Sequence, residues 1–231
     1  LENSRQEFVS NVSHELKTPI TTIKSYTETL MDYRDIDQDL SNKFLSVIDN
    51  ECDRMARIVR NLLQLSNLDY NKTKWNKVEY PVEKLIRDSC LKLEFAFKEK
   101  EQSFHIDIEE DVPDIVIAKD GMEQVILNII SNAIKYTPNK GNIDILARNK
   151  DENVIITVKD NGIGIPEEDK GRIFERFYRV DKGRSRELGG TGLGLSIAKQ
   201  IVEAHGGDII LKSEYKVGTE VDIILPAVVD V

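Results

Sequence analysis

The sequence predicts a two-domain protein in which an all-α helical hairpin, able to pair into a dimeric four-helix bundle, precedes an α+β sandwich. Apolar residues recur at alternating spacings of three and four in residues 9–33, as in coiled coils, and a second series over 44–65 predicts another long amphipathic helix. This periodicity stops in the polar stretch 71–81, and helical and strand-like patterns are mixed beyond it. We therefore expect a hairpin over 1–71, a linker over 72–80 and a mixed domain over 81–231.

Composition narrows the class of protein. The 231 residues exceed one typical domain, and 40% hydrophobic with 32% charged residues is typical of a folded globular chain. The net charge of −9 opposes binding to a phosphate backbone, so nucleic acid is not an expected partner. No apolar run approaches the roughly 20 residues that cross a bilayer, so this part of the chain is expected to make no membrane contact. Cys52 and Cys90 are predicted to be reduced thiols of a cytoplasmic protein.

The hairpin is predicted from a heptad seam followed by a second amphipathic helical series. The first runs from Val9 to Tyr33 and the second from Phe44 to Leu65, with a short polar connection between them. Because such a hairpin leaves its apolar stripes exposed, we expect two copies to pair as a homodimer. The helical pattern is already in progress at the first residues, which predicts a fragment of a longer chain.

The second domain mixes both periodicities. The predicted helices cover 82–98, 122–136, 169–177 and 193–205, and the predicted strands cover 104–108, 143–148, 154–159, 208–213 and 220–225. The last four strands form two pairs with short connections, which is typical of antiparallel hairpins. The order of helices and strands indicates an α+β sandwich.

His14 is the first candidate reactive residue. With Val9 at heptad position a, His14 falls at position f, which faces solvent. A neutral imidazole is a nucleophile near pH 7, and Glu15 can accept or orient its proton, while Thr18 lies one turn further on. Pro19 predicts a kink close to His14, although it can also mark a helix end. By itself an exposed His-Glu pair is more often only a solvated surface.

The helix predicted at 122–136 carries an unusual polar stripe. Gln124, Asn128, Asn132 and Lys135 fall within about 80° of one another on the face opposite the apolar residues. Asn is a weak helix former, so a merely solvated face favours Glu or Lys instead. Amide oxygens suit a hard cation such as Mg²⁺, and an ammonium group suits phosphate. The stripe therefore predicts a site for a metal-bound phosphate chain.

Two glycine-rich segments accompany this stripe. The segment 160–166 begins with Asp160 at the end of a predicted strand, where a carboxylate can accept a hydrogen bond from an exocyclic amine such as that of adenine. The segment 189–195 leads into a helix, where backbone N–H groups form an anion site. Neither a G-x-G-x-x-G nor a Gly-Lys-Ser/Thr motif occurs, which excludes the Rossmann and P-loop classes.

Three further features have weaker predictions. The basic stretch 182–189, with Lys182, Arg184 and Arg186, predicts a mobile lid over a triphosphate, and the alternative is a disordered surface loop. His205, followed by two glycines, is predicted to act structurally as a cation or polar group at a helix C-terminus. His105 in a predicted strand is given no role.

Residues 10–19, Ser-Asn-Val-Ser-His-Glu-Leu-Lys-Thr-Pro, resemble the phosphoacceptor box of sensor histidine kinases. The resemblance implies that His14 carries a phosphoryl group and that Glu15 serves as general base. It also implies that Thr18 positions water for dephosphorylation of a partner protein.

The second domain resembles the Bergerat or GHKL-type ATP-binding domain of histidine kinases, Hsp90, type II topoisomerases and MutL. The matching boxes are the N box (128–136), the first glycine box (160–164), the phenylalanine box (174–177) and the second glycine box (190–194). The resemblance implies that Asn132 holds Mg²⁺ with Asn128 beside it, that Lys135 and Arg179 contact phosphates, that Tyr136 packs near the base and that Asp160 reads the adenine amine. The implied ATP-binding set is Asn128, Asn132, Lys135, Tyr136, Asp160, Gly162, Gly164, Arg179, Gly190, Thr191, Gly192, Leu193 and Gly194.

These resemblances imply phosphoryl transfer from ATP·Mg²⁺ to His14 and onward to an aspartate in the receiver domain of a response regulator, with phosphatase activity toward that regulator. The segments 177–181 and 203–207 resemble the WalK/PhoR-like branch, which implies a full-length protein anchored in the membrane. Two alternatives stay open: an ATPase of the same fold that drives clamping, and a catalytically inactive dimeric scaffold.

Overall fold

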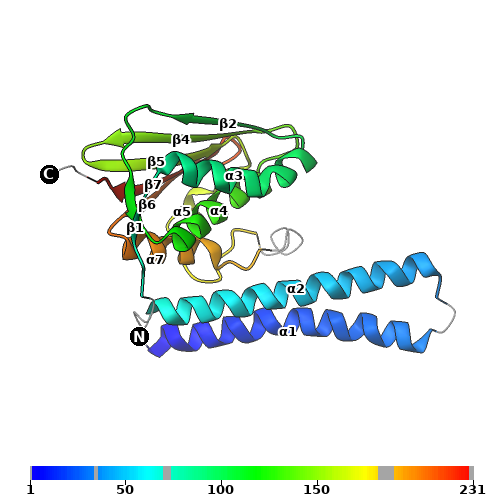
Figure 1. The fold of residues 1–231 in the computed structure, drawn as a ribbon. Helices are drawn as coiled ribbons and strands as arrows, with labels where there is room; N and C mark the ends of the chain where they lie inside the picture. The colour runs from blue at the N-terminus through cyan, green and yellow to red at the C-terminus, as the bar shows by residue number, and fades with distance from the viewer. Residues whose placement is uncertain (1, 34–35, 70–73, 182–189, 229–231) are drawn as a thin grey trace.

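The computed structural model describes residues 2–33, 36–69, 74–181 and 190–228. Two long antiparallel helices, α1 (Glu2–Asp32) and α2 (Gln38–Asp69), form the predicted hairpin, and the mixed domain lies along one side of it (Figure 1). The rings of Tyr26 and Phe44, 4.9 Å apart between centroids, help to fix the register of the two helices. None of the described helices is both long and apolar enough to cross a bilayer.

The two helices form where the apolar periodicity predicts them, and some of their apolar side chains remain exposed. Helix α1 continues through Pro19, which is buried, so the alternative of a helix end at this proline is wrong. Val9 on α1, Tyr33 just after the end of α1 and Leu63 on α2 remain exposed in the single chain. Exposed apolar side chains on a long hairpin are the surface that pairing of two copies would bury.

The mixed domain is built on a five-stranded sheet with the order β2-β4-β5-β7-β6. Its strands are β2 (Ser103–Ile108), β4 (Asn142–Lys150), β5 (Asn153–Asp160), β6 (Asp208–Glu214) and β7 (Gly218–Pro226). Strands β4 and β5, and β6 and β7, are antiparallel as predicted, whereas β2 pairs with β4 in parallel.

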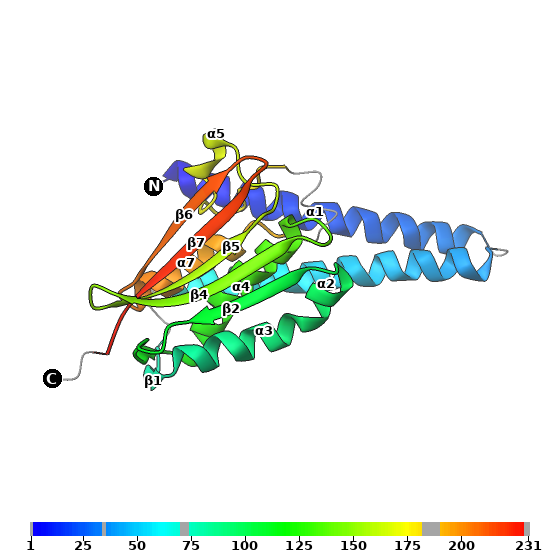
Figure 2. The same ribbon diagram turned by 90° about the horizontal axis from the view of Figure 1, so that it is seen from above.

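Helices α3 (Val82–Glu99), α4 (Lys119–Tyr136) and α7 (Gly194–Ala204) pack on the face of the sheet that is turned toward the hairpin (Figures 1 and 2). The core between sheet and helices is rich in isoleucine and valine, and alternate residues of β4 and β5 point into it. Cys90 of α3 lies in this core and Cys52 is exposed on α2. The structure thus confirms the predicted α+β sandwich.

The structure corrects one local prediction and adds two short strands. The helix predicted at 169–177 is wrong, because α5 covers only Glu167–Lys170 and turns follow it. Phe177 has φ of 65°, which no α-helix accommodates. Two strands were missed, β1 (Val78–Tyr80) and β3 (Ile115–Ile117), which pair with each other. Three residues are too few to display a period.

Strand β1 lies inside the predicted linker, and the residues before it are also attached to the mixed domain. The indole of Trp75 contacts the ring of His205, 5.1 Å between centroids, and Lys77 Nζ donates to the carbonyl oxygen of Ala204 at 2.8 Å. The second half of the predicted linker is therefore bound to the mixed domain.

His205 has the structural role predicted for it, but as a neutral group. Its Nε2 accepts the Ala118 N–H at 3.0 Å, so its Nδ1 donates to the Ile201 carbonyl oxygen at 2.7 Å. Burial lowers the pKa of His205, which disfavours the predicted cation. Gly206, at φ of 78°, supplies the predicted glycine cap.

We expect Gly121→Ala to displace Trp75, because an added Cβ would lie 2.6 Å from the indole ring. Alanine normally stabilises a helix by about 0.5–1 kcal/mol relative to glycine, so destabilisation of the folded protein here would be diagnostic. Trp75 is the single tryptophan, so its fluorescence emission should shift to the red in this variant. Gly171→Ala is the control, since a Cβ there meets no atom within 4 Å. Unchanged emission in Gly121→Ala would contradict the docking of Trp75.

Candidate functional site

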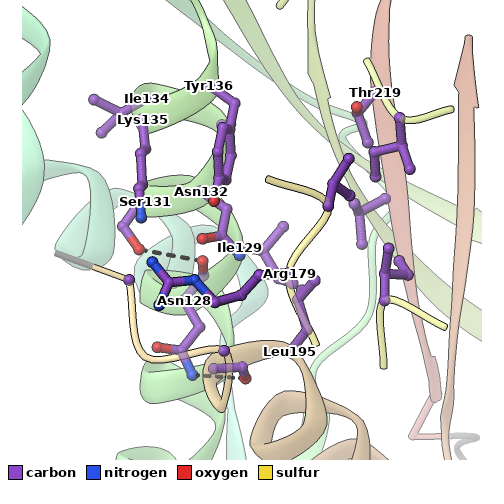
Figure 3. Close-up of a pocket in the computed structure, with 18 of the residues that line it drawn as sticks. Asn128, Ile129, Ser131, Asn132, Ile134, Lys135, Tyr136, Arg179, Leu195 and Thr219 are labelled. Carbon is purple, nitrogen blue, oxygen red and sulfur yellow. Dashed lines mark hydrogen bonds between the residues drawn. The ribbon is translucent and has the colours of Figure 1, made fainter. Parts of the chain in front are cut away.

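A cavity of about 580 Å³ opens between α4, the turn after β5 and the glycine-rich segment before α7, on the side of the domain that faces α2. Figure 3 shows the polar residues of α4 and Arg179 directed toward it. The residues of the predicted ATP-binding set that line the cavity are Asn128, Asn132, Lys135, Tyr136, Asp160, Gly164, Arg179, Gly190, Thr191, Gly192 and Gly194.

Gly162 and Leu193, the other two members of that set, do not line the cavity. The Gly162 N–H donates to Asp160 Oδ1 at 2.8 Å, and a Cβ on Gly162 would lie 2.6 Å from the Tyr136 carbonyl oxygen. Gly162 therefore allows a close backbone approach that orients Asp160. The side chain of Leu193 is fully buried in the core, where an apolar group at the start of α7 is more stable than in a polar cavity.

Helix α4 delivers the polar stripe to the cavity because its isoleucines hold the opposite face in the core. Asn128 Nδ2 donates to the Gly194 carbonyl oxygen at 3.2 Å, which ties the N box to the second glycine box. Asn132 and Lys135 extend from the next turns of α4 (Figure 3). The amide oxygen of Asn132 is a hard ligand of the kind that Mg²⁺ accepts.

Lys135 lies in an unfavourable environment for a cation. Burial, followed by the positive charges of Arg179, Arg57 and Lys100, lowers the pKa of Lys135 to about 8. Several cations around one cavity repel one another, and a bound anion relieves that repulsion. The electrostatics of the site therefore favour a phosphate ligand.

Asp160 ends β5 at another wall of the cavity. Burial raises the pKa of Asp160, while hydrogen bonds from the backbone N–H groups of Gly162 and Thr219 act in the opposite direction. A partly buried carboxylate oxygen is a strong acceptor for an amine donor. This arrangement fits the recognition of an adenine amino group.

The second glycine box is fixed to the phenylalanine box. The Phe177 N–H donates to the Gly192 carbonyl oxygen at 2.8 Å, and Gly192 has φ of 71°. A Cβ on Gly192 would lie 2.8 Å from the carbonyl carbon of Phe177, so this approach requires glycine. Gly194 and Leu195 at the N-terminus of α7 line the cavity, and the first N–H groups of a helix suit an anion. The lid predicted at 182–189 lies outside the described residues.

His14 is exposed on α1, as the heptad position predicts. Thr18 Oγ1 donates to the His14 carbonyl oxygen at 3.3 Å. Glu15 points elsewhere: its Oε2 lies 2.8 Å from Arg54 Nη2 of α2 and 3.6 Å from Nη1 of the cavity residue Arg179. All three side chains are at most 12% exposed. The residue beside His14 is thus in direct ionic contact with the cavity.

The hairpin and the mixed domain meet along α2. Gln64 and Gln124 exchange two side-chain hydrogen bonds at 2.6 and 2.8 Å, and Asn61 Nδ2 donates to Thr191 Oγ1 at 3.3 Å. Asp69 accepts two hydrogen bonds from Arg176, one of them at 2.8 Å, which lower the pKa of Asp69. These contacts hold the cavity against the hairpin.

Sequence analysis missed the contribution of α2 to the site. The residues of this region without a prediction are Arg54, which pairs with Glu15, and Arg57, Arg60 and Asn61, which line the cavity. Arg54 pairs with a residue 39 positions away, which no short motif reveals. A usable signal was the spacing of polar residues at 57, 61 and 64, which places them on one helical face.

Comparison with known proteins gives matches to both parts of the chain. Residues 4–71 match the family described as His Kinase A (phospho-acceptor) domain, and residues 117–229 match the family described as Histidine kinase-, DNA gyrase B-, and HSP90-like ATPase. The sensor histidine kinase WalK of Bacillus subtilis (strain 168) is 44% identical over 232 residues, covering 98% of this chain and 37% of the relative. The sensor protein kinase WalK of Staphylococcus aureus is 42% identical over 228 residues, covering 98% and 54%.

Solved structures agree with these matches. The histidine kinase ThkA, in complex with response regulator protein TrrA, superposes with a TM-score of 0.79 at 27% identity, over 96% of this chain and 61% of that one. The Acinetobacter baumannii histidine kinase AdeS shares the fold, with a TM-score of 0.73 at 22% identity, over 93% and 98%.

We expect Lys135→Gln to raise the free energy of unfolding of the ligand-free protein at neutral pH. Because the pKa of Lys135 falls from 10.5 to about 8 on folding, the unfolded chain binds the extra proton between these values, and stability rises with pH in that window. The destabilisation of the folded protein by charged Lys135 is therefore fully present below pH 8 and absent above about pH 10.5. Denaturant unfolding at pH 7 and pH 10 measures it.

Lys150→Gln, at the exposed end of β4, is the matched control and should leave both values unchanged. A Lys135→Gln protein that is less stable than the parent at pH 7 would contradict the crowding of positive charge at this site.

Proposed function

The chain belongs to the sensor histidine kinase family, and we propose that it transfers the γ-phosphoryl group of ATP to His14 and then to an aspartate of a response regulator. The chain spans 37% of the length of its Bacillus subtilis relative. The observation that carries the proposal is the contact between Glu15, next to the exposed His14, and Arg179 of the cavity at 3.6 Å. This contact brings the helical turn that carries the exposed His14 next to a cavity that is suited to bind phosphate.

The cavity fits ATP and Mg²⁺. Asp160 and Tyr136 lie where the adenine would bind, and Lys135 and Arg179 lie where the phosphates would bind. The Asn132 amide would hold Mg²⁺, which when bound neutralises charge on the phosphate oxygens. The match to the ATPase family over residues 117–229 supports the use of ATP.

The proposed reaction depends on positioning. A nitrogen of the neutral His14 imidazole forms a bond to the γ-phosphorus, the bond from that phosphorus to the bridging oxygen breaks, and ADP leaves with the electron pair. His14 does not line the cavity in this arrangement, so the ATPase domain must shift along the hairpin before transfer. Glu15, once the same shift of the ATPase domain has freed it from Arg179, would turn to His14 and accept the proton from the other imidazole nitrogen.

We propose the division into a hairpin over 1–71, a linker over 72–80 and a catalytic domain over 81–231, which the family match at 4–71 supports. Homodimerisation would cover the exposed apolar residues of the hairpin. A response regulator as partner is supported by the solved complex of ThkA with TrrA. We also propose that the full-length protein is anchored in the membrane with this region in the cytoplasm.

Incubation with γ-labelled ATP should place acid-labile, base-stable label on the protein. We expect His14→Gln to remove the label and Asn132→Asp to reduce it at least about a hundredfold, since it weakens metal and phosphate positioning. His105→Gln, exposed on β2, is the matched control. ATP hydrolysis without label would favour the clamping ATPase, and nucleotide binding without either reaction would favour the inactive scaffold.

Thr18→Ala should slow dephosphorylation of the phosphorylated regulator by about tenfold or more, because a positioned hydroxyl orients the attacking water. Autophosphorylation of His14 should change little, since the Thr18 hydroxyl donates to the backbone carbonyl oxygen of His14 and not to its imidazole. Thr27→Ala, which has the same type of helical back-bond at Ile23, is the control. Equal loss of both activities would indicate a structural role for Thr18.

A further inference from the structure

One face of α2 is turned toward the ATPase domain along its C-terminal half. Asn61 and Gln64 on this face hydrogen-bond Thr191 and Gln124. Arg57 lies one turn before Asn61 at helical spacing, so it belongs to the same face. This places its guanidinium at the part of the interface where the nucleotide cavity opens.

Arg57 and Arg60 line the cavity together with the residues of the N box. The charged side chains among the described lining residues are Arg57, Arg60, Lys135, Arg179, Asp160 and Asp181. Asp160 lies at the proposed adenine end, so the phosphate end has an excess of positive charge. The hairpin supplies half of these cations.

The ordinary role of an exposed helical arginine is a surface ion pair. In the described part of the chain, however, neither Arg57 nor Arg60 forms an ion pair with a carboxylate, although Arg54 on the same helix pairs with Glu15. The charge of Arg57 is also felt at Lys135, whose pKa it helps to lower. Arg57 therefore adds to a concentration of positive charge instead of neutralising a neighbour.

Arg57 is also close to the reacting histidine along the hairpin. Glu15 of α1 pairs with Arg54 of α2, so these two residues lie at the same level of the antiparallel helices. Arg57, three residues beyond Arg54, lies less than one turn away from that level. A phosphate chain bound by Arg57 would therefore lie at about the same level along the hairpin axis as His14.

We propose that Arg57 of the hairpin binds the phosphate chain of the nucleotide held by the ATPase domain, so that the site for nucleoside di- and triphosphates is complete only when this domain is docked on α2. The inference rests on the proposed function, since it assumes a nucleotide in the cavity. By linkage, nucleotide then favours the docked arrangement as much as docking favours nucleotide.

The test is titration calorimetry of the whole chain with Mg²⁺ and ADP, and with adenosine. We expect Arg57→Gln to weaken ADP binding by about 5- to 30-fold, the effect of losing one charge-assisted phosphate contact, and to leave adenosine binding unchanged. Arg57→Lys should restore most of the affinity. Lys43→Gln, exposed at the far end of α2, is the matched control and should bind both ligands as the parent does.

If Arg57→Gln binds ADP as tightly as the parent does, the inference fails and the proposed function stands. Equal weakening of ADP and adenosine binding would also overturn the inference, because it would indicate a structural role for Arg57. If the parent chain binds no ADP, the proposed function fails together with it.

A second arm tests the dependence on docking. Asp69→Asn weakens the contact with Arg176, and we expect it to weaken ADP binding in the parent but not in the Arg57→Gln background. Additive losses would show that Arg57 acts without domain docking, which overturns that part of the proposal.

Discussion

The ionic contact that Glu15 makes with Arg54 and Arg179 is the interaction on which the rest of the arrangement depends. Arg54 and Arg179 are almost fully buried, and a buried guanidinium is tolerated only beside an anion. Glu15 supplies that anion from the turn that presents His14. Any phosphate that binds Arg179 competes with Glu15 for the same guanidinium, so occupancy of the cavity changes the charge next to the phosphoacceptor.

The cavity is assembled at a cost in stability that the domain core offsets. Asn128 and Asn132 are weak helix formers, Lys135 is a crowded cation, and Gly192 accommodates a backbone approach that other residues cannot make. Against these stand the buried isoleucines of α4 and the alternating valines and isoleucines of β4 and β5. One face of α4 carries residues that are unfavourable for helix stability, and the opposite face carries well-buried apolar residues. This is expected where one helix supplies both the core and the site.

The long, strongly periodic elements were predictable from sequence, whereas contacts between distant segments were not. The seams of α1 and α2 and the polar stripe of α4 follow from a single period, and the structure places them as expected. The helix predicted at 169–177 is wrong, because Phe177 has a positive φ and its N–H donates to the carbonyl oxygen of Gly192. Leu193 was predicted to bind ATP because it lies within the glycine box. A sequence motif does not show that its side chain is buried in the core and not directed into the cavity. Arg54 pairs with Glu15, 39 positions away on the other helix, and Arg57 lines a cavity of the other domain, so no short motif reveals either contact.

Apart from the buried pair of Glu15 and Arg179, the docked arrangement is held by contacts of modest strength, and these decide how readily the domain position changes. Asp69 and Arg176 are about one-third exposed, and such pairs contribute about 0–1 kcal/mol. Trp75 and β1 are attached to the ATPase domain, so a shift of that domain on the hairpin breaks the contacts of Asp69, Gln64 and Asn61 and leaves those of Trp75 intact. A ligand biases two arrangements only through its differential affinity for them. The phosphate contact proposed for Arg57, about 1–2 kcal/mol, is equal to or somewhat larger than one docking contact, so nucleotide state and domain position are coupled at comparable energies.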